Sequence, residues 1–582
     1  MRISGWESEK ATEELREEIE EYVVRIRYER TPSIPFDGYR HFVERGSRKE
    51  SEAAYFEVRK RLAALSLYLL WNTTGTFHKQ DVMQLNEILW SISNEFTWCL
   101  AAHLPYVDTG FPSDASSQID LFAAETAATL SEITSMHRDI IHPFILAHIQ
   151  RQIKDRIFHP FLEKEWGWET RNNNWSAVCA GSIGIAALLL AEDSLKQKLL
   201  IKVERALGYY LEGFGEDGAT DEGIGYWAYG FGYYTYYTAM RQEMEPGYQR
   251  SKKLYPKLKA IAELPQYLQM NNNTYVPFSD SMAEAAIPSG LLCYLKKEYD
   301  IELPACPVVP SFDSDHCYRF QHISRNLWWT DGRLLSETSQ DTVKYMADKQ
   351  WLIQRRNPCY FAVKGGNNQE SHNHNDVGSF VFAIAGEQLL TDLGAGAYTA
   401  NYFGEKRYTY PQTRSYYHNV AVVANQEQKS GPYQCKILAV KEDAECASIT
   451  LELSELYQIP ELQTFRRKLI SDTKANQMIL EDYYKASEPI CFEEGFVSVV
   501  KPQLKQAGCL TLIGRYGRMS LSYDDTMLYY KEEKVVVRNH HGREETVYRV
   551  GLWTKDLAEE RLVRILLSYE YNEALLNHES CT

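Results

Sequence analysis

The chain has 582 residues, 44% of them hydrophobic and 24% charged, which is the balance of an ordinary globular protein and enough for roughly two to four domains. Its formal net charge of −16 argues against a general nucleic-acid binder, because such proteins carry a basic footprint. No apolar run reaches the ~20 residues that cross a bilayer, and Met1 to Glu7 contains no signal-peptide core. We expect a cytoplasmic protein with no nucleic-acid and no membrane partner, in which any acidic ligand meets a local basic pocket.

The first half of the chain predicts one helix after another. Apolar residues recur at helical spacing on otherwise charged stretches, and short loops with Pro, Gly or Asn separate them. No strand pattern interrupts this series, which favours an all-α layer or ring. The predicted helices are Thr12 to Arg27, Glu52 to Trp71, Ser117 to Ile133, Asp139 to Arg156, Ile183 to Glu192, Leu195 to Gly213 and Tyr255 to Leu268.

The pattern changes near Pro304 to Pro307, after which short, alternating runs rich in β-branched and aromatic residues predict an antiparallel β-sandwich. We place a helical domain at 1–308 and a β domain at 309–582, with room for a small C-terminal β subdomain. Two large layers that meet along a seam form a cleft, where ligands bind. The runs are Asn326 to Trp329, Trp351 to Ile353, Cys359 to Val363, Ser379 to Ile384, Val420 to Ala424, Ala447 to Leu453 and Val535 to Arg538.

Groups that bind protons or metals gather at the start of one predicted strand. His372, His374 and Asp376 occupy alternate positions, so an extended backbone would place all three on one face. Asp392 follows the next predicted strand, and His418 opens a later one. Two imidazoles and one carboxylate from different strands are ligands that zinc accepts. A polar, hydrogen-bonded strand entrance without metal explains the same residues.

The HxHxD pattern is also typical of metallo-hydrolases. In those enzymes a further histidine usually follows the aspartate directly, whereas this chain has Val377 there. The pattern therefore leaves a metal-dependent hydrolase open and does not favour it.

Three stretches of the helical half combine polar groups with aromatic rings. The asparagines from Asn172 to Asn174 precede Trp175, and helix capping explains one of the three. Glycines precede Tyr226 and Trp227 at the expected start of a helix. Aromatic packing explains each ring as well as ligand contact does. A third stretch supplies a carboxylate, a ring and an imidazole, namely Glu95, Trp98 and His103.

Taken in order, these motifs resemble the heparinase II/III-like polysaccharide lyase superfamily. The resemblance extends from about residue 95 to residue 430, and it implies a multidomain α+β protein with an N-terminal (α/α) toroid, an incomplete helical barrel, followed by an antiparallel β-sandwich. The motifs are Glu95/Trp98/His103, the LFAAET run from Leu121, the NNW at Asn173 to Trp175, the DEGxxYW at Asp221 to Trp227, the HNHNDVGSF block and the SYYHNV block.

The resemblance implies a lyase that cleaves uronic-acid-containing glycans, most often glycosaminoglycans, by β-elimination. The proton α to the uronate carboxylate must be removed, so neutral or cationic donors have to stabilise the enolate-like transition state. By resemblance, Asn174 and His372 neutralise the carboxylate or assist proton transfer. Tyr226 acts as base and then as acid, and because a tyrosine has a reference pKa of ~10, nearby donors must favour its phenolate.

The resemblance also implies a structural zinc held by His374, Asp392 and His418, no organic cofactor, and an acidic poly- or oligosaccharide as partner. It allows a homodimer. A surface salt bridge is the alternative role for Arg414. The implied substrate contacts are Asn173, Trp175, Glu95, Trp98, His103, Trp227 and Arg414.

One position departs from the family pattern. Many members carry a histidine directly after the asparagine pair, where this chain has Trp175. Either His103 or His372 takes the place of that imidazole, or Trp175 forms a stacking floor for a sugar ring. Besides a lyase, the sequence thus leaves a metal-dependent hydrolase and a non-catalytic glycan-binding protein as alternatives.

Overall fold

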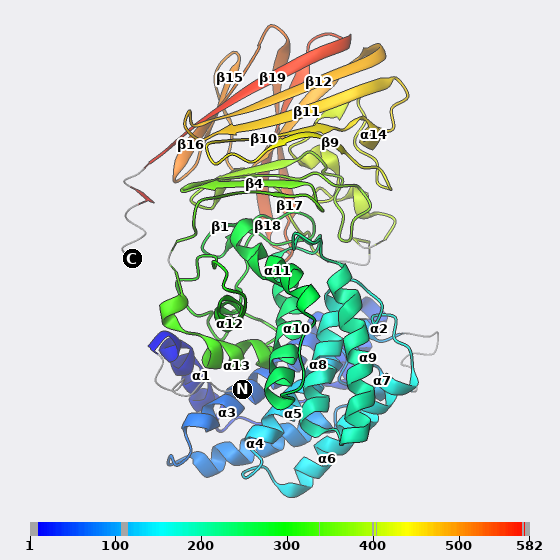
Figure 1. The fold of residues 1–582 in the computed structure, drawn as a ribbon, viewed down its shortest axis with the longest axis vertical. Helices are drawn as coiled ribbons and strands as arrows, with labels where there is room; N and C mark the ends of the chain where they lie inside the picture. Colours follow the sequence, from blue (N-terminus) through cyan, green and yellow to red (C-terminus); the bar gives the residue numbers. More distant parts are fainter. Residues whose placement is uncertain are drawn as a thin grey trace.

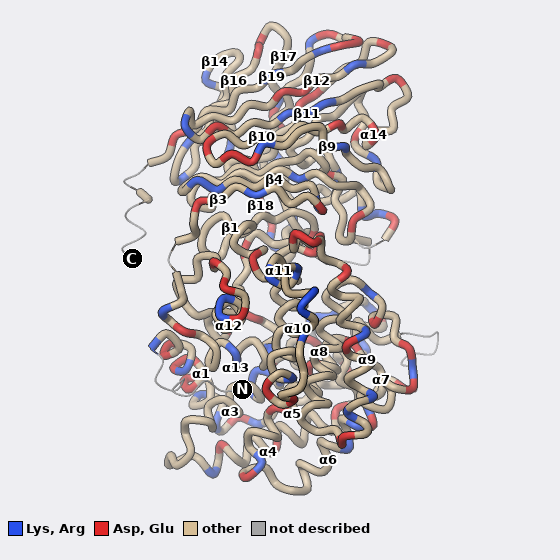
Figure 2. The backbone as a smooth tube through the Cα atoms, viewed as in Figure 1, with Lys and Arg blue, Asp and Glu red and all other residues tan. Residues whose placement is uncertain are grey.

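The computed structural model describes residues 10–105, 114–336, 338–398, 401–402, 404–572 and 575–576. Helices form one half of the molecule and antiparallel sheets the other (Figure 1). The predicted order, a helical toroid followed by a β-sandwich, is confirmed. Within the described residues, no helix has the length and apolar composition needed to cross a membrane. Acidic and basic residues are interspersed over both halves (Figure 2).

The helical half is built around α8, which contacts α5, α9 and α10. Because α8 has neighbours on most sides, its sequence lacks a polar face. The α-helices are α1 (Glu13–Ile26), α2 (Phe36–Arg45), α3 (Lys49–Trp71), α4 (His78–Ser93), α5 (Leu121–Met136), α6 (Pro143–Ile153), α7 (His159–Glu163), α8 (Asn174–Leu190), α9 (Asp193–Glu212), α10 (Ile224–Met244), α11 (Tyr255–Leu268), α12 (Ser289–Tyr299), α13 (Phe320–Trp329) and, in the β half, α14 (Ser454–Tyr457).

Glycines let α8 and α10 approach each other closely. A Cβ atom at Gly181 would lie 2.8 Å from the carbonyl oxygen of Tyr233, and one at Gly184 would overlap the ring of Tyr237. A larger residue at either position would push the two helices apart. This close approach fixes the N-terminal ends of α8 and α10 relative to each other.

The β half contains a five-stranded sheet (β3-β4-β5-β6-β7), a four-stranded sheet (β17-β18-β13-β8) and an eight-stranded sheet (β14-β15-β16-β19-β12-β11-β10-β9), and β1 and β2 form a separate hairpin. All these pairs are antiparallel. The strands are β1 (Gln269–Asn271), β2 (Thr274–Tyr275), β3 (Thr342–Met346), β4 (Trp351–Arg356), β5 (Cys359–Val363), β6 (Phe380–Ile384), β7 (Glu387–Leu390), β8 (Val422–Val423), β9 (Lys436–Lys441), β10 (Cys446–Glu452), β11 (Leu462–Asp472), β12 (Gln477–Ile490), β13 (Phe492–Ser498), β14 (Gln503–Gln506), β15 (Cys509–Ile513), β16 (Gly517–Tyr523), β17 (Leu528–Arg538), β18 (Glu544–Thr554) and β19 (Ala558–Tyr571).

The five-stranded sheet is the middle layer of the molecule. Val381 and Ala383 of β6 belong to the hydrophobic core shared with the helices, whereas Phe380, Phe382 and Ile384 belong to the core of the sandwich. Alternate residues of a strand point to opposite faces, so β6 is buried on both sides. This explains why its sequence is apolar throughout rather than alternating.

Two sequence predictions about the β half are wrong in detail. Asn326 to Trp329, expected as a strand, lies in α13, every residue of which is buried. Taken alone, the apolar run Leu327 to Trp329 at the end of this helix is as typical of a buried strand as of a buried helix. Because α13 packs against α12, the helical half continues past the boundary expected at 308. Of the run Val420 to Ala424, only Val422–Val423 forms a strand.

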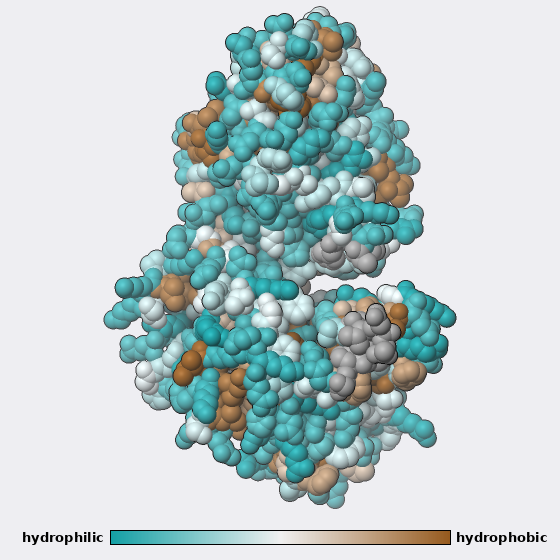
Figure 3. Space-filling model, turned by 90° about the vertical axis from the view of Figure 1, so that its right-hand side faces the viewer, coloured by the Kyte–Doolittle hydropathy of each residue, from teal (hydrophilic) through white to brown (hydrophobic). Residues whose placement is uncertain are grey.

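Hydrogen bonds tie the middle sheet to the end of α11. The guanidinium of Arg355 on β4 donates to the carbonyl oxygens of Gln266 and Gln269, at 2.7 and 2.8 Å. The hydroxyl of Tyr360 on β5 donates to the carbonyl of Tyr267 at 2.7 Å. On one side the two halves separate, and a notch opens between them (Figure 3).

A buried arginine in the sandwich holds the loops that lead to the junction. Arg467 of β11 is fully buried and pairs with Asp482 at 2.7 Å and with Glu494 at 2.8 Å. Its remaining guanidinium nitrogen donates to the carbonyls of Gly378 and Asn419. Gly378 lies two residues after the HNHND block, and Asn419 follows His418 directly. One cation therefore fixes both segments.

Replacement of Arg467 by alanine should lower the free energy of unfolding by about 3–5 kcal/mol, because two buried carboxylates lose their counter-charge. Urea unfolding measures the change. The neighbouring Arg466→Ala is the matched control, since Arg466 is half exposed and pairs with Glu452 at 3.4 Å. That control should change stability by no more than about 0.5 kcal/mol. Equal effects of the two variants would contradict the anchoring role.

Candidate functional site

The HNHND block is a turn and not a strand, because β6 begins only at Phe380. His372 has a left-handed backbone with φ of +56°, which rotates its side chain relative to an extended segment. The backbone is therefore not extended here, and His372, His374 and Asp376 do not share one face as an extended strand would require. Asp376 instead accepts a hydrogen bond from the buried ammonium of Lys364 at 2.7 Å.

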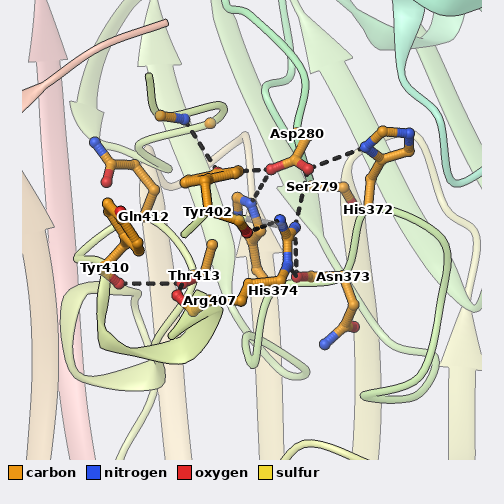
Figure 4. Close-up of polar contacts among 12 residues, drawn as sticks. Ser279, Asp280, His372, Asn373, His374, Tyr402, Arg407, Tyr410, Gln412 and Thr413 are labelled. Carbon is orange, nitrogen blue, oxygen red and sulfur yellow. Dashed lines mark hydrogen bonds and ion pairs between the residues drawn. The ribbon is translucent and has the colours of Figure 1, made fainter. Parts of the chain in front are cut away.

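The two histidines of the block meet at a residue from the other half of the molecule. Asp280 lies between β2 and α12, and its carboxylate is fully buried. One oxygen lies 3.0 Å from Nδ1 of His372, and the other lies 3.0 Å from Nε2 of His374. The hydroxyl of Tyr402 and the guanidinium of Arg407 also donate to it, at 2.7 and 2.9 Å (Figure 4).

These donors decide the charge of Asp280. Burial alone would raise the pKa of the carboxyl group, because an ion loses its hydration. The hydrogen bonds from His372 and His374 and the charge of Arg407 outweigh burial and hold this pKa far below its ordinary value. Asp280 is thus an anion that can only accept hydrogen bonds.

A second cluster brings together the three predicted metal ligands. His374, Asp392 and His418 are buried, and one potential ligand atom from each lies within 4.8 Å of the others. Nδ1 of His418 is 3.1 Å from a carboxylate oxygen of Asp392, and Nε2 of His418 lies 2.9 Å from the carbonyl of Gln412.

This cluster fits a zinc ion. The buried Nδ1 of His374 has no hydrogen-bond partner, while Nε2 of the same ring is held by Asp280. A metal-bound imidazole has this arrangement, in which one nitrogen faces the ion and the other donates to an oxygen. Burial lowers the pKa of His374 and so favours the neutral form that binds metal.

Tyr226 faces the β half from the first turn of α10. The helix starts after Gly223, which has a φ of +81°, and a Cβ atom there would lie 2.6 Å from the side chain of Ser281, so no side chain fits. The ring of Tyr226 stacks on that of His372, with centroids 5.3 Å apart, and its hydroxyl lies 3.3 Å from the hydroxyl of Tyr398. Burial raises the pKa of Tyr226, and the hydrogen bond with Tyr398 opposes this rise.

Asn174 is buried at the first position of α8. Its backbone N–H donates to Glu222 at 2.9 Å, four residues before Tyr226. The other carboxylate oxygen of Glu222 is buried without a partner. Burial raises the pKa of Glu222 to about 7, and the nearby His372 limits the rise. The three residues predicted to be catalytic, Asn174, Tyr226 and His372, are thus brought together around Glu222.

Trp175 and His103 lie side by side, although different segments supply them. Their ring centroids are 5.1 Å apart, and Nδ1 of His103 lies 2.8 Å from Asp120. Asn173 is the N-cap of α8, and its side chain accepts the N–H of Trp175 at 3.2 Å. The asparagine run therefore includes one capping residue, as expected.

Four residues predicted to contact substrate are engaged elsewhere. Trp98 and Trp227 are each 1% exposed and belong to the helical core, so as core residues they have no surface for a ligand. The carboxylate of Glu95 is paired with both terminal nitrogens of Arg59. The guanidinium of Arg414 pairs with Glu427, which is the salt bridge that the sequence left as its alternative.

Sequence reasoning missed Asp280, Glu222, Tyr398, Tyr402 and Arg407. Glu222 stands inside the DEGxxYW motif, so its position four residues before Tyr226 was an available signal. Asp280 is separated by more than 90 residues from both histidines, and no local pattern marks it.

The chain is similar to several known proteins in sequence or in fold. Residues 342–498 match the family described as Heparinase II/III-like, C-terminal. The fold resembles a mutant of heparan sulfate lyase HepC from Pedobacter heparinus, with a TM-score of 0.64 and 11% identity over 89% of this chain and 77% of that one. It resembles a structure named Heparinase III, with a TM-score of 0.65 and 13% identity over 97% and 86% of the two chains. No curated protein matches the sequence significantly.

A third similar structure is the chondroitin AC lyase of Streptomyces coelicolor A3 in complex with chondroitin sulphate, with a TM-score of 0.54 and 11% identity over 100% of this chain and 81% of that one. At these identities the likeness establishes a shared fold, the helical toroid with an antiparallel β-sandwich. The family match over residues 342–498 and the shared fold confirm the resemblance that the sequence motifs indicated.

The raised pKa of Glu222 predicts a pH-dependent stability. The folded protein keeps this proton up to about pH 7, whereas the ordinary value is 4.5, so the free energy of unfolding falls as pH rises between these values. Glu222→Gln removes the effect, so the wild type should lose about 3 kcal/mol relative to the variant across this range. Urea unfolding at several pH values measures the difference. The exposed Glu192→Gln controls for the lost charge, and a pH-independent difference would contradict the prediction.

Proposed function

We propose that the protein is a polysaccharide or oligosaccharide lyase that cleaves uronic-acid-containing glycans by β-elimination, with a glycosaminoglycan-type substrate. The observation that carries this proposal is the contact between Tyr226 and His372 across the junction of the two halves, with Asn174 bonded to Glu222 just before Tyr226. Names of similar structures include heparan sulfate, chondroitin and xanthan lyases, which supports this class of reaction.

Asn174 and His372 neutralise the substrate carboxylate. Elimination develops negative charge on the sugar carboxylate when the adjacent C–H bond breaks, so donors aimed at that group lower the barrier. The amide of Asn174 donates directly, whereas His372 donates from Nε2 only as the imidazolium, because its Nδ1–H faces Asp280. Asp280 accepts from Nδ1 of His372, which leaves Nε2 for the cleft.

Tyr226 removes the proton and then protonates the leaving oxygen. Burial raises the pKa of Tyr226 and favours its phenol form, which is the form that acts as acid. The base step requires the phenolate, which the hydrogen bond with Tyr398 and the charge of Arg319 favour. A single phenol can therefore serve both proton transfers in sequence.

The geometry weighs against the metal-dependent hydrolase. His372, His374 and Asp376 do not converge on one point, because Asp376 binds Lys364 and His372 faces Tyr226. The residues that do converge, His374, Asp392 and His418, are fully buried and have no exposed face for a substrate. A metal there would brace the β half rather than activate water.

The metal proposal has a direct test. Protein prepared without added metal should contain about one zinc per chain, held by His374, Asp392 and His418. His418→Ala should lose the metal and lower the thermal midpoint, whereas Arg414→Ala, which alters an ion pair nearby in sequence, should keep it. Elemental analysis provides the measurement. A correctly folded wild type with no zinc would remove this part of the proposal.

Elimination has its own product signature, a conjugated unsaturated uronate that absorbs in the ultraviolet, whereas hydrolysis leaves no such chromophore. We expect absorbance to increase with at least one of hyaluronan, chondroitin, heparan sulfate and alginate. Tyr226→Phe should lower turnover by about 100-fold or more, the usual contribution of a general acid or base.

Tyr234→Phe, the same change on the same helix but within the hydrophobic core, is the matched control and should retain turnover. Wild-type turnover in Tyr226→Phe would refute the assignment of the base and acid. Binding of these glycans without any absorbance change would instead favour the non-catalytic glycan-binding protein.

A further inference from the structure

One carboxylate joins two imidazoles that serve different ends. In the carboxylate of Asp280, Oδ2 is hydrogen-bonded to Nδ1 of His372. The other oxygen, Oδ1, is hydrogen-bonded to Nε2 of His374. The ring of His372 continues to Tyr226, and the ring of His374 continues to the cluster with Asp392 and His418. Asp280 thus lies between the proposed catalytic group and the candidate metal site (Figure 4).

We propose that Asp280 is a positioning residue that fixes the tautomers of both histidines, so that His372 presents Nε2 to the substrate and His374 presents Nδ1 to the metal. The role of His372 in this statement rests on the proposed lyase function. The roles of His374 and of Asp280 itself do not.

The argument starts from hydrogen-bond chemistry. A neutral imidazole has one N–H donor and one bare acceptor nitrogen, and a carboxylate can only accept. Each ring must therefore turn its N–H toward Asp280. This places the proton on Nδ1 of His372 and on Nε2 of His374, which leaves the opposite nitrogen of each ring bare. The same carboxylate selects opposite tautomers in the two rings.

The other partners of Asp280 keep its carboxylate in place. Tyr402 donates to Oδ1 and Arg407 to Oδ2, so each oxygen has two donors. Arg407 also donates to the backbone carbonyl of Asn373, the residue between the two histidines. The anion, the two rings and the connecting backbone therefore form one closed set of contacts.

The backbone on both sides of this contact is held in a conformation that residues with side chains rarely adopt. His372 has a φ of +56° and Ser279, directly before Asp280, has a φ of +62°. Non-glycine residues remain in this region where surrounding contacts determine the geometry, and such residues gather at functional sites. Ser279 is fixed further by the ammonium of Lys364, 3.3 Å from its hydroxyl.

Asp280→Asn tests the proposal, because an amide has nearly the shape of a carboxylate but offers one acceptor and one donor. One of the two rings would then face an N–H group and must reverse its tautomer or rotate. We expect either the zinc content or kcat to fall by about 10- to 100-fold, the usual effect of changing a group that orients a metal-bound or reacting imidazole. KM should change less than kcat.

The decisive readout is spectroscopic. In wild-type protein with ¹⁵N-labelled histidine, at about pH 9 where imidazoles of ordinary pKa are neutral, His372 should carry its proton on Nδ1 and His374 on Nε2. Asp280→Asn should change the tautomer of at least one ring. Tyr402→Phe removes a donor that is not an imidazole, so it should leave both tautomers unchanged.

A neutral His372 with its proton on Nε2 in the wild type would overturn the inference. Because this measurement uses only the wild-type protein, it does not depend on whether a variant folds. Unchanged tautomers together with unchanged zinc content in Asp280→Asn would also overturn it. Because neither readout requires turnover, a wild type inactive on every uronate would refute the lyase proposal and leave the test of Asp280 intact.

Discussion

The arrangement of the site depends on one buried anion. A carboxylate removed from water is strongly destabilising unless charges and hydrogen bonds compensate it. Asp280 meets this requirement only where His372, His374, Tyr402 and Arg407 converge, and all four belong to the β half. The segment that carries Asp280 connects β2 to α12, so the contact also fixes the helical half against the sandwich. Displacing any donor would leave part of the charge uncompensated.

The layering of the molecule explains why this contact can be precise. One face of the five-stranded sheet packs on the helices and the other packs on the sandwich. The turn that leads into β6 is therefore attached to a strand that is packed tightly on both faces. Arg467 holds that turn from the sandwich side through Gly378. On the helical side, Gly181 and Gly184 bring α8 and α10 together, which places Asn174 and Tyr226 at neighbouring helix ends. Rigid elements from both halves thus support the residues for which proton transfer is proposed.

The sequence predicts most elements because amphipathic helices and half-buried strands have distinct periods. It fails at the end of α13, where the short apolar run Leu327 to Trp329 is as typical of a buried strand as of a helix. Motif resemblance identifies Tyr226, Asn174 and the histidines, but it also selects Trp98 and Trp227, since a sequence does not show which ring faces a core. Asp280 remained hidden because its partners are distant along the chain, and the turn at His372 depends on contacts that only the folded protein makes.

The tryptophan at position 175 takes its meaning from the same kind of long-range contact. A family histidine after the asparagine pair would project from α8, whereas here the ring of Trp175 rests against His103 from a preceding 3₁₀ turn. Asp120 caps α5 through one oxygen, and the other lies against Nδ1 of His103. An imidazole from a different segment thus lies against Trp175 and is held by a carboxylate, as His372 is held by Asp280. Asp120 and Asp280 each bind Nδ1 of a histidine, so the Nε2 atom of that ring points away from the carboxylate. Carboxylates at a helix end and in a loop thus set the direction of the imidazoles on both sides of the junction.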